Sequence, residues 1–327
     1  LIGKKNVPYL LKEDVTMSKK KIINIYKDFT NLATYPGVKK VSENTFIISK
    51  NLNLEENFYI EKDKNFSIDN NVVIKLLNNS ILFIKGNIKF EGTKENKIYV
   101  KSDGTGSIIF ENNNVEIYNT NFENLGYPKL DLFTLFAGLN FIGSSVILKN
   151  INVKDSKSED AINLINSNTS LKNIYLENIQ SDAIDVDFGY FKFDKIYCLK
   201  IKNDCLDISG SEVSGIELEI DRSLDKGLSV GENSTVKIED LTVHNSKLAI
   251  AVKDGSRSYV QNFNSLNNQY DIALFNKKKE YDNPSLNIKN FSNSEKKILQ
   301  SKESKLIIGG KNILGNESNL YINSILY

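Results

Sequence analysis

The stretch that decides the fold is SDAIDVDFG, from Ser181 to Gly189, because closely similar segments recur along the chain at a fixed interval. SEDAINLI begins at Ser158, NDCLDIS at Asn203 and DKGLSVG at Asp225, and each aligns with the next after 22 residues. Within each segment apolar and polar residues alternate, which is the pattern of a β-strand with one buried face. The repeat therefore predicts one short strand per 22-residue unit, stacked in register.

The apolar positions of these units form two columns that face one core. The columns are Ile162, Ile184, Leu206, Leu228 and Ile250, and Leu164, Val186, Ile208, Val230 and Val252. A second strand precedes each unit, as in LKNINV, LKNIYL and FDKIYC. A coil this short cannot bury its own apolar face, so neighbouring coils must stack. We expect an all-β, single-stranded right-handed parallel β-helix; leucine-rich repeats are the nearest rival, but their N/C-x-L ladder is absent.

The repeat also predicts the domain organisation. A solenoid counts as one domain whatever its length, and we expect it to span residues 41–327, with the clearest repeats over 145–278. Residues 1–40 have mixed, partly helical spacing, typical of a cap on an exposed sheet edge. Residues 123–144 break the repeat and are expected to form a loop excursion near the functional face, and residues 285–327 are expected to form closing coils.

Composition excludes some functions. The 42 Lys and Arg residues nearly balance the 41 Asp and Glu residues, and this argues against general nucleic-acid binding. No apolar run reaches the roughly 20 residues of a membrane helix. Cys198 and Cys205 have no metal-binding spacing, and we expect free, mostly buried thiols. The two cysteines therefore do not indicate whether the protein works in an oxidising or a reducing compartment. Because the numbering begins at Leu1 rather than Met, we expect either a processed chain or an excised piece of a longer one, from which any targeting segment is already gone.

The same register stacks polar residues in three further columns. They are Asp160, Asp182, Asp204 and Lys226; Asn163, Asp185, Asp207 and Ser229; and Ile165, Asp187, Ser209, Gly231 and Lys253. Equivalent residues of adjacent coils lie about 4.8 Å apart. Two ionised carboxylates at that distance repel by roughly 3–4 kcal/mol at an effective dielectric constant near 20. The repulsion must be relieved by a bound cation, by lysines, by turn N–H groups or by raised pKa values.

Each kind of relief predicts a different role for the carboxylates. A cation site would hold Ca²⁺ through Asp185, Asp187, Asp207 and Glu232. Raised pKa values would supply a general acid beside a general base, and the candidate catalytic residues are Asp182, Asp185, Asp204, Asp207, Lys226 and Lys253. The two lysines would serve as base or as binders of a sugar carboxylate. Turn hydrogen bonds, the purely structural alternative, are expected above all for Asp160, Asp182 and Asp204.

The repeat resembles the β-helices of the pectate-lyase-like superfamily over about residues 40–327. SDAIDVDF, NDCLDISGS and AVKDGS are most similar to a group of bacterial β-helix proteins often found beside a CotH-type kinase-like domain, and this resemblance implies a secreted or surface location and a CotH-type partner. A looser similarity to polygalacturonases places Asp182 or Asp185, Asp204 and Lys253 at matching positions. Lys226 stands where that family has histidine, its paired aspartates are here Asn-Asp, and its arginine is missing.

The sequence leads to two competing hypotheses. The first is an extracellular or cell-surface protein that binds or modifies an acidic polysaccharide or surface glycan, as a polysaccharide lyase, glycoside hydrolase or epimerase. The second is a non-catalytic adhesin or structural module. The first predicts accessible carboxylates at Asp185, Asp187 and Asp207, whereas the second predicts that backbone N–H groups saturate them.

Overall fold

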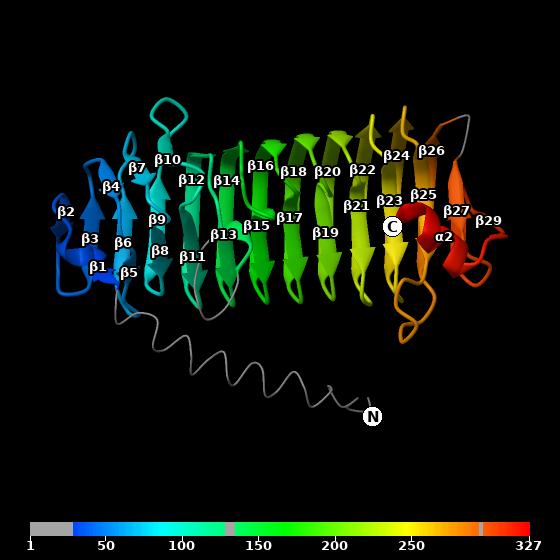
Figure 1. Ribbon diagram of the computed structural model, residues 1–327, viewed down its shortest axis with the longest axis horizontal. Helices are drawn as coiled ribbons and strands as arrows, with labels where there is room; N and C mark the ends of the chain where they lie inside the picture. Colours follow the sequence, from blue (N-terminus) through cyan, green and yellow to red (C-terminus); the bar gives the residue numbers. More distant parts are fainter. Residues whose placement is uncertain (1–28, 128–134, 294–296) are drawn as a thin grey trace.

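The computed structural model describes residues 29–127, 135–293 and 297–327 and shows a β-helix (Figure 1). Successive coils stack along one axis, from β2 at one end to β29 at the other. The expected fold class is confirmed. Of the predicted cap, residues 1–28 lie outside the described residues, and residues 29–40 contribute β1, the 3₁₀ turn η2 (Leu32–Thr34) and β2.

Sheet A takes one strand from each coil, and all its pairings are parallel. Its strands are β1 (Thr30–Asn31), β5 (Phe58–Ile60), β8 (Ile81–Ile84), β11 (Ser107–Glu111), β13 (Ala137–Ile142), β15 (Asp160–Ile165), β17 (Asp182–Asp187), β19 (Leu206–Ser209), β21 (Lys226–Gly231), β23 (Leu248–Lys253), β25 (Tyr270–Phe275) and β27 (Ile298–Gln300).

Sheet B covers the rest of each coil. Its strands are β2 (Val38–Lys40), β3 (Thr45–Ile48), β4 (Leu52–Leu54), β6 (Asn65–Ile68), β7 (Val73–Leu76), β9 (Asn87–Glu91), β10 (Ile98–Ser102), β12 (Asn114–Glu123), β14 (Ser145–Lys154), β16 (Asn168–Ile179), β18 (Tyr190–Ile201), β20 (Glu212–Ser223), β22 (Thr235–His244), β24 (Arg257–Leu266), β26 (Ser285–Ser292), β28 (Lys305–Ile308) and β29 (Lys311–Ile313). Several of its long strands bend at a left-handed asparagine, such as Asn150 with φ 58°. Asparagine tolerates this conformation, and Asn173 Nδ2 donates to Asn150 Oδ1 at 2.9 Å.

The predicted register is correct. Ile184 pairs with Ile162 on one side and with Leu206 on the other, and Val186 pairs with Leu164 and Ile208. Both apolar columns are buried in the central core. The predicted excursion over residues 123–144 is correct only in part: Ile108 of β11 pairs with Leu139 of β13 after 31 residues, but Ala137–Ile142 is a regular strand of sheet A. Residues 128–134 of this excursion lie outside the described residues.

The closing coils are only partly as expected. Residues 285–313 supply β26, β27, β28 and β29, but Asn319–Leu326 forms helix α2 instead of a strand. The Ser318 side chain caps this helix by accepting from Tyr321 N. Ile322 and Leu326, one turn apart, are its buried residues. No helix in the described ranges is long and apolar enough to cross a membrane.

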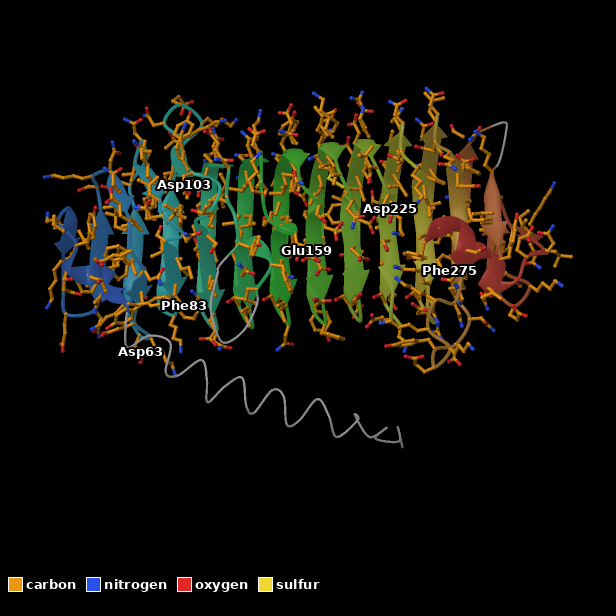
Figure 2. The ribbon with its side chains drawn as sticks, in the orientation of Figure 1. Asp63, Phe83, Asp103, Glu159, Asp225 and Phe275 are labelled. Carbon is orange, nitrogen blue, oxygen red and sulfur yellow. A yellow bond between two sulfur atoms is a disulfide. The ribbon has the colours of Figure 1, made fainter. Side chains whose placement is uncertain are left out.

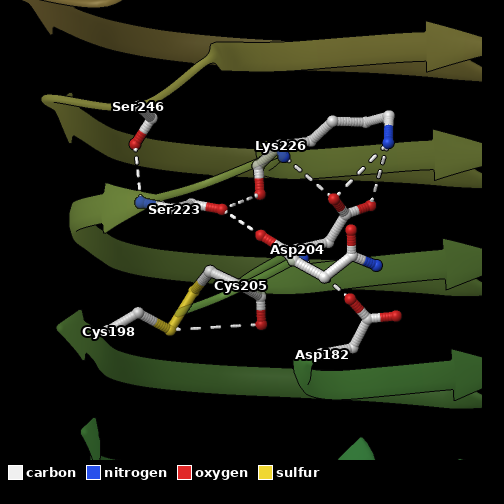
Figure 3. The surroundings of a disulfide bond; sticks show 8 residues. Asp182, Cys198, Asp204, Cys205, Ser223, Lys226 and Ser246 are labelled. Atoms are coloured by element: carbon white, nitrogen blue, oxygen red, sulfur yellow. Dashed lines mark hydrogen bonds and ion pairs between the residues drawn. A yellow bond between two sulfur atoms is a disulfide. The ribbon is translucent and has the colours of Figure 1, made fainter. Parts of the chain in front are cut away.

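The expectation of free thiols is wrong, because Cys198 and Cys205 form a disulfide (Figure 3). Cys198 lies on β18 and Cys205 lies directly before β19, and their Cα atoms are 6.1 Å apart. The turn between the two strands brings both side chains into the interior, where neither is exposed to solvent. The seven-residue spacing thus spans one corner of a coil. The pairing of the two cysteines depends on the shape of this turn and could not be predicted from the spacing alone.

Candidate functional site

One column of register partners runs along the outer face of sheet A, and the polarity of its side chains changes along the column. It comprises Tyr59, Phe83, Ile109, Asn140, Asn163, Asp185, Asp207, Ser229, Ala251, Ala273 and Leu299. Beyond Asn31, which pairs with Tyr59 in the first coil, the stretches from Tyr59 to Ile109 and from Ala251 to Leu299 are aromatic or apolar, and the five residues from Asn140 to Ser229 are polar. Phe83 and Phe275 mark the two apolar ends in Figure 2, with Glu159 and Asp225 between them. The polar middle of this face is the candidate site.

Apolar packing covers both ends of the outer face. Near the N-terminal end, Phe83 packs in a cluster with Phe29, Ile81 and Ile109. At the other end, Ile322 and Leu326 of α2 pack on a patch made of Leu248, Ala251, Ala273, Phe275 and Leu299. These contacts serve stability, because they remove apolar surface from water. The aspartates between the two ends take no part in this apolar packing, so stability of the core does not explain them.

The column of Asp182, Asp204 and Lys226 is held by hydrogen bonds between coils (Figure 3). Asp182 Oδ1 accepts from Asp204 N at 2.7 Å, and Asp204 Oδ1 accepts from Lys226 N at 2.9 Å. Each carboxylate therefore accepts a backbone N–H of the next coil. The structural interpretation fits this column well, although the donors come from the next coil and not from the residues that follow each aspartate.

Lys226 is the charge partner of this column. Its Nζ lies 3.4 Å from Asp204 Oδ1, contacts the carboxylate of Asp225, and lies 5.1 Å from the centre of the Tyr327 ring. Desolvation acts to lower the pKa of Lys226, but Asp204, Tyr327 and Asp225 outweigh it, and the pKa is raised. An ammonium with a raised pKa is a poor general base near neutral pH.

Asp185, Asp187 and Asp207 differ, because interstrand backbone N–H groups do not saturate them. Among the described residues, Asp185 Oδ2 accepts only from Asn163 Nδ2, at 3.2 Å. In the same part of the chain, Asp207 Oδ1 accepts only from the adjacent Ile208 N, at 3.0 Å. Asp187 makes no hydrogen bond within the ranges that the structure describes. All three are half-buried, and their carboxylates keep acceptor positions for a group from outside.

Burial separates the pKa values of these aspartates. Desolvation, reinforced by Asp187 and other carboxylates, raises the pKa of Asp185 to about 9. The pKa of Asp187 is raised to about 6 by desolvation and by Asp207. Near pH 7 a neutral carboxylic acid therefore lies two residues from an ionised carboxylate, which is the arrangement of an acid and base pair.

The neighbouring aspartates are also shifted. Desolvation raises the pKa of Asp160 to about 6, of Asp182 to about 7 and of Asp204 to about 8. Asp204 is almost fully buried, and the Lys226 ammonium only partly offsets the cost of ionising it. Protonation thus relieves much of the repulsion that the stacked aspartates would otherwise create.

Lys253 supplies a cation on the other side of the site. It is 9% exposed, and it makes no ion pair or hydrogen bond within the described part of the chain. A Cβ on Gly231 would lie 3.5 Å from Lys253 Cε, so the missing side chain of Gly231 leaves room for the lysine. Desolvation acts to lower its pKa, but Asp207 and other groups outweigh this and raise it. Lys253 is a buried ammonium that makes no ion pair within the described residues, although the charge of Asp207 stabilises it.

Buried oxygens without partners occur in the same column. The side-chain oxygens of Asn140, Asn163 and Ser229 are buried and accept no hydrogen bond from the described residues. Buried polar groups nearly always have a partner. These oxygens flank Asp185 and Asp207 in register, and their hydrogen-bonding capacity is not met within the described residues.

The structure does not assemble the predicted Ca²⁺ ligands. The Glu232 carboxylate contacts Lys278 Nζ, although its charge still acts on Asp187. Within the described ranges, no three side chains of His, Cys, Asp or Glu gather closely enough to hold a metal ion. Asp185, Asp187 and Asp207 lie near one another, but as a row on the sheet.

Comparisons with known proteins concern the fold. No family model matches the chain, and no curated protein matches it, so the resemblance to the CotH-associated group stays a prediction. Among solved structures, a double mutant of the periplasmic alginate epimerase AlgG is 10% identical over 86% of this chain and 83% of its own, with a TM-score of 0.45. The alginate lyase from Paenibacillus sp. str. FPU-7 is 10% identical over 79% and 99%, with a TM-score of 0.39. At this identity, these likenesses say nothing about a reaction.

Proposed function

We propose that the protein binds an acidic polysaccharide across the outer face of sheet A and modifies it by acid–base chemistry. The observation that carries the proposal is the triad Asp185, Asp187 and Asp207, whose carboxylates keep free acceptor positions beside the unpartnered ammonium of Lys253. Mid-strand aspartates are disfavoured in sheets. Carboxylates and a buried cation that lack partners of their own are typical of a site that serves a ligand.

Charge balance supports an acidic substrate. The neutral form of Asp185 near pH 7 removes negative charge from the face, and the Lys226 ammonium balances the Asp204 carboxylate. Lys253 then offers its ammonium to a sugar carboxylate, replacing the partner that the fold does not supply. A neutral carboxylic acid can also donate a hydrogen bond to a substrate carboxylate.

The chemistry that fits best begins with removal of the proton on the carbon beside a uronate carboxylate. The charge that develops on this carboxylate would be stabilised by Lys253 and by the neutral acid of Asp185. Asp187, ionised near neutral pH, would accept the proton. Return of a proton to the other face gives epimerisation, and loss of the neighbouring glycosidic oxygen gives a lyase product.

The disulfide supports an extracellular or cell-surface location. Disulfides persist in oxidising compartments and are rare in the cytosol. Cys198 and Cys205 join two strands of one coil at the corner that leads into the site, since Asp204 directly precedes Cys205. An exported protein would also meet polymers that cannot enter a cell, and a CotH-type partner would belong to the same compartment.

The alternative, a non-catalytic adhesin or structural module, is favoured by one observation. Asp182 and Asp204 accept backbone N–H groups and need no ligand. If every aspartate behaved in this way, the face would be a scaffold. The two functions therefore differ in what Asp185, Asp187 and Lys253 do.

The test incubates the full chain with polygalacturonate, polymannuronate and polyguluronate, with Ca²⁺ or with a chelator. Unsaturated products absorb in the ultraviolet, hydrolysis gives new reducing ends, and epimerisation carries solvent deuterium into the polymer. We expect one of these signals and its loss by at least 100-fold in Asp187→Asn and Lys253→Met, with Asp194→Asn on sheet B as the control. Binding of a polymer with no turnover would establish the adhesin, and neither binding nor turnover would overturn the proposal.

A further inference from the structure

Phe188 lies at the end of the candidate site in a conformation that bulky residues avoid. It directly follows Asp187 and has φ 54°. The equivalent positions of neighbouring coils are Asn166 with φ 47° and Gly210 with φ 59°, and these residue types accept the left-handed region. A phenylalanine there is strained, and strained residues concentrate where function requires them.

Burial does not explain this phenylalanine. Its side chain is 61% exposed, so it contributes little to the core. A Cβ on Gly210 would lie 2.5 Å from Phe188 Cδ1, so the ring lies directly against the backbone of Gly210. The ring is thus fixed in one orientation and still presents a large apolar surface to solvent.

A second exposed aromatic side chain continues this surface around the corner. Tyr190, the first residue of β18, is 65% exposed and lines a cavity of about 240 Å³ together with Lys192, Lys237 and Glu212. Phe188 and Tyr190 therefore extend from the aspartates of sheet A toward two ammonium groups and one carboxylate on sheet B. Exposed apolar surface next to polar groups is typical of a binding site.

We infer that Phe188 is a stacking platform for one sugar ring of the polysaccharide, adjoining the acid–base residues and positioning the chain. The C–H face of a pyranose packs well on a flat aromatic ring, whose edges leave the sugar hydroxyls free. Tyr190, Lys192 and Lys237 would hold the next uronate of the same chain. This inference rests on the proposed function and names the contact that positions its substrate.

The strain makes the inference testable in a way that separates function from stability. Asn occupies the equivalent position in the preceding coil, so Phe188→Asn should fold and melt no lower than the wild type. If the ring binds sugar, the same variant loses affinity for hexamers of galacturonate and mannuronate by at least tenfold, and Phe188→Tyr restores it. Leu266→Asn, which removes a side chain that is 51% exposed on β24, should leave affinity unchanged.

A fluorescence measurement gives an independent readout, because the chain contains no tryptophan. In Phe188→Trp the hexamer should shift the emission of the single indole, whereas in Leu266→Trp it should not. Wild-type affinity in Phe188→Asn, or no shift in Phe188→Trp while the hexamer binds, overturns the platform and leaves the proposed function standing. Binding of neutral cellohexaose alone, lost in Phe188→Asn, keeps the platform and overturns the acidic substrate. No binding of any hexamer to the wild type overturns both.

Discussion

Asp185 on β17 and Asp207 on β19 are register partners on the outer face of sheet A, one coil apart. Their neighbours in the strands, Ile184, Val186, Leu206 and Ile208, all point into the core. The fold thus places the two residues about 5 Å apart along the stack. Burial, together with the charges of Asp187, Asp160 and Asp207, favours the neutral form of Asp185.

The first prediction concerns stability against pH. The pKa of Asp185 is about 9 in the folded protein against 3.8 for an ordinary aspartate. The folded state therefore binds this proton more tightly, so the stability it confers is complete below about pH 4 and is lost as the pH rises toward 9. Asp185→Asn, neutral at every pH, should raise the free energy of unfolding at pH 8 by about 1–3 kcal/mol in denaturant titrations.

Asp103 provides a control of opposite sign. Desolvation acts to raise its pKa, but hydrogen bonds from Thr105 and from Asn78 N outweigh it and lower the pKa. A carboxylate with a lowered pKa stabilises the fold above its unfolded pKa, and this stability is lost as the pH falls. Asp103→Asn should therefore destabilise the protein at pH 8. Equal effects of the two substitutions would contradict the burial argument for Asp185.

The second prediction concerns the space over Gly231. An added Cβ would be in ordinary van der Waals contact with Lys253, at 3.5 Å from Cε and 4.0 Å from Nζ. Gly231→Ala should therefore keep both fold and activity. Gly231→Val should displace the ammonium, raise KM for the acidic polymer and lower kcat, since Lys253 both binds the substrate carboxylate and stabilises the charge that develops on it. A kcat loss at constant KM would assign Lys253 to the chemical step alone.

The third prediction concerns the disulfide. Cys198 and Cys205 are fully buried, so dithiothreitol should not reduce them until the protein unfolds, as thiol titration would show. The loop that they close is short, and the double variant Cys198→Ala, Cys205→Ala should lose about 2–3 kcal/mol of unfolding free energy. Rapid reduction of the native protein would show that this corner opens easily.

The fourth prediction concerns α2. Ile322 is fully buried against the apolar patch of sheet A, and Ile322→Asp should detach the helix while the β-helix stays folded. The far-ultraviolet spectrum should keep its strand signal while a hydrophobic dye binds the uncovered patch. Leu320→Asp, on the same helix but 81% exposed, is the matched control. Dye binding by both variants would mean that α2 is not held by this patch.

The sequence was sufficient for the register, since a 22-residue spacing leaves only one way to stack Ile162, Ile184 and Leu206. It was also sufficient to bring Asp185 and Asp207 together, because strand pairing fixes both at once. Which aspartates remain unsaturated was not readable, because it depends on whether a backbone N–H of the next coil points at the carboxylate. That geometry separates Asp204 from Asp185.

Contacts between distant segments were also beyond the sequence pattern. NLYINSILY alternates enough to suggest a strand, but Ser318 and the pair Ile322 and Leu326 make it a helix that packs on sheet A. The Tyr327 ring beside Lys226 follows from that packing. The repeat itself marks Phe188 as unusual. It occupies the turn position at which the neighbouring coils have Asn166 and Gly210, so an aromatic residue at this position could have been recognised from the sequence.

The two ends of sheet B have a consequence for assembly. β2 pairs antiparallel with β3, and β29 pairs antiparallel with β28, whereas the coils between them stack in parallel. A second molecule that continued the stack of sheet B would have to pair with a strand that runs antiparallel to the coils. End-to-end growth could therefore not repeat the parallel register of the interior.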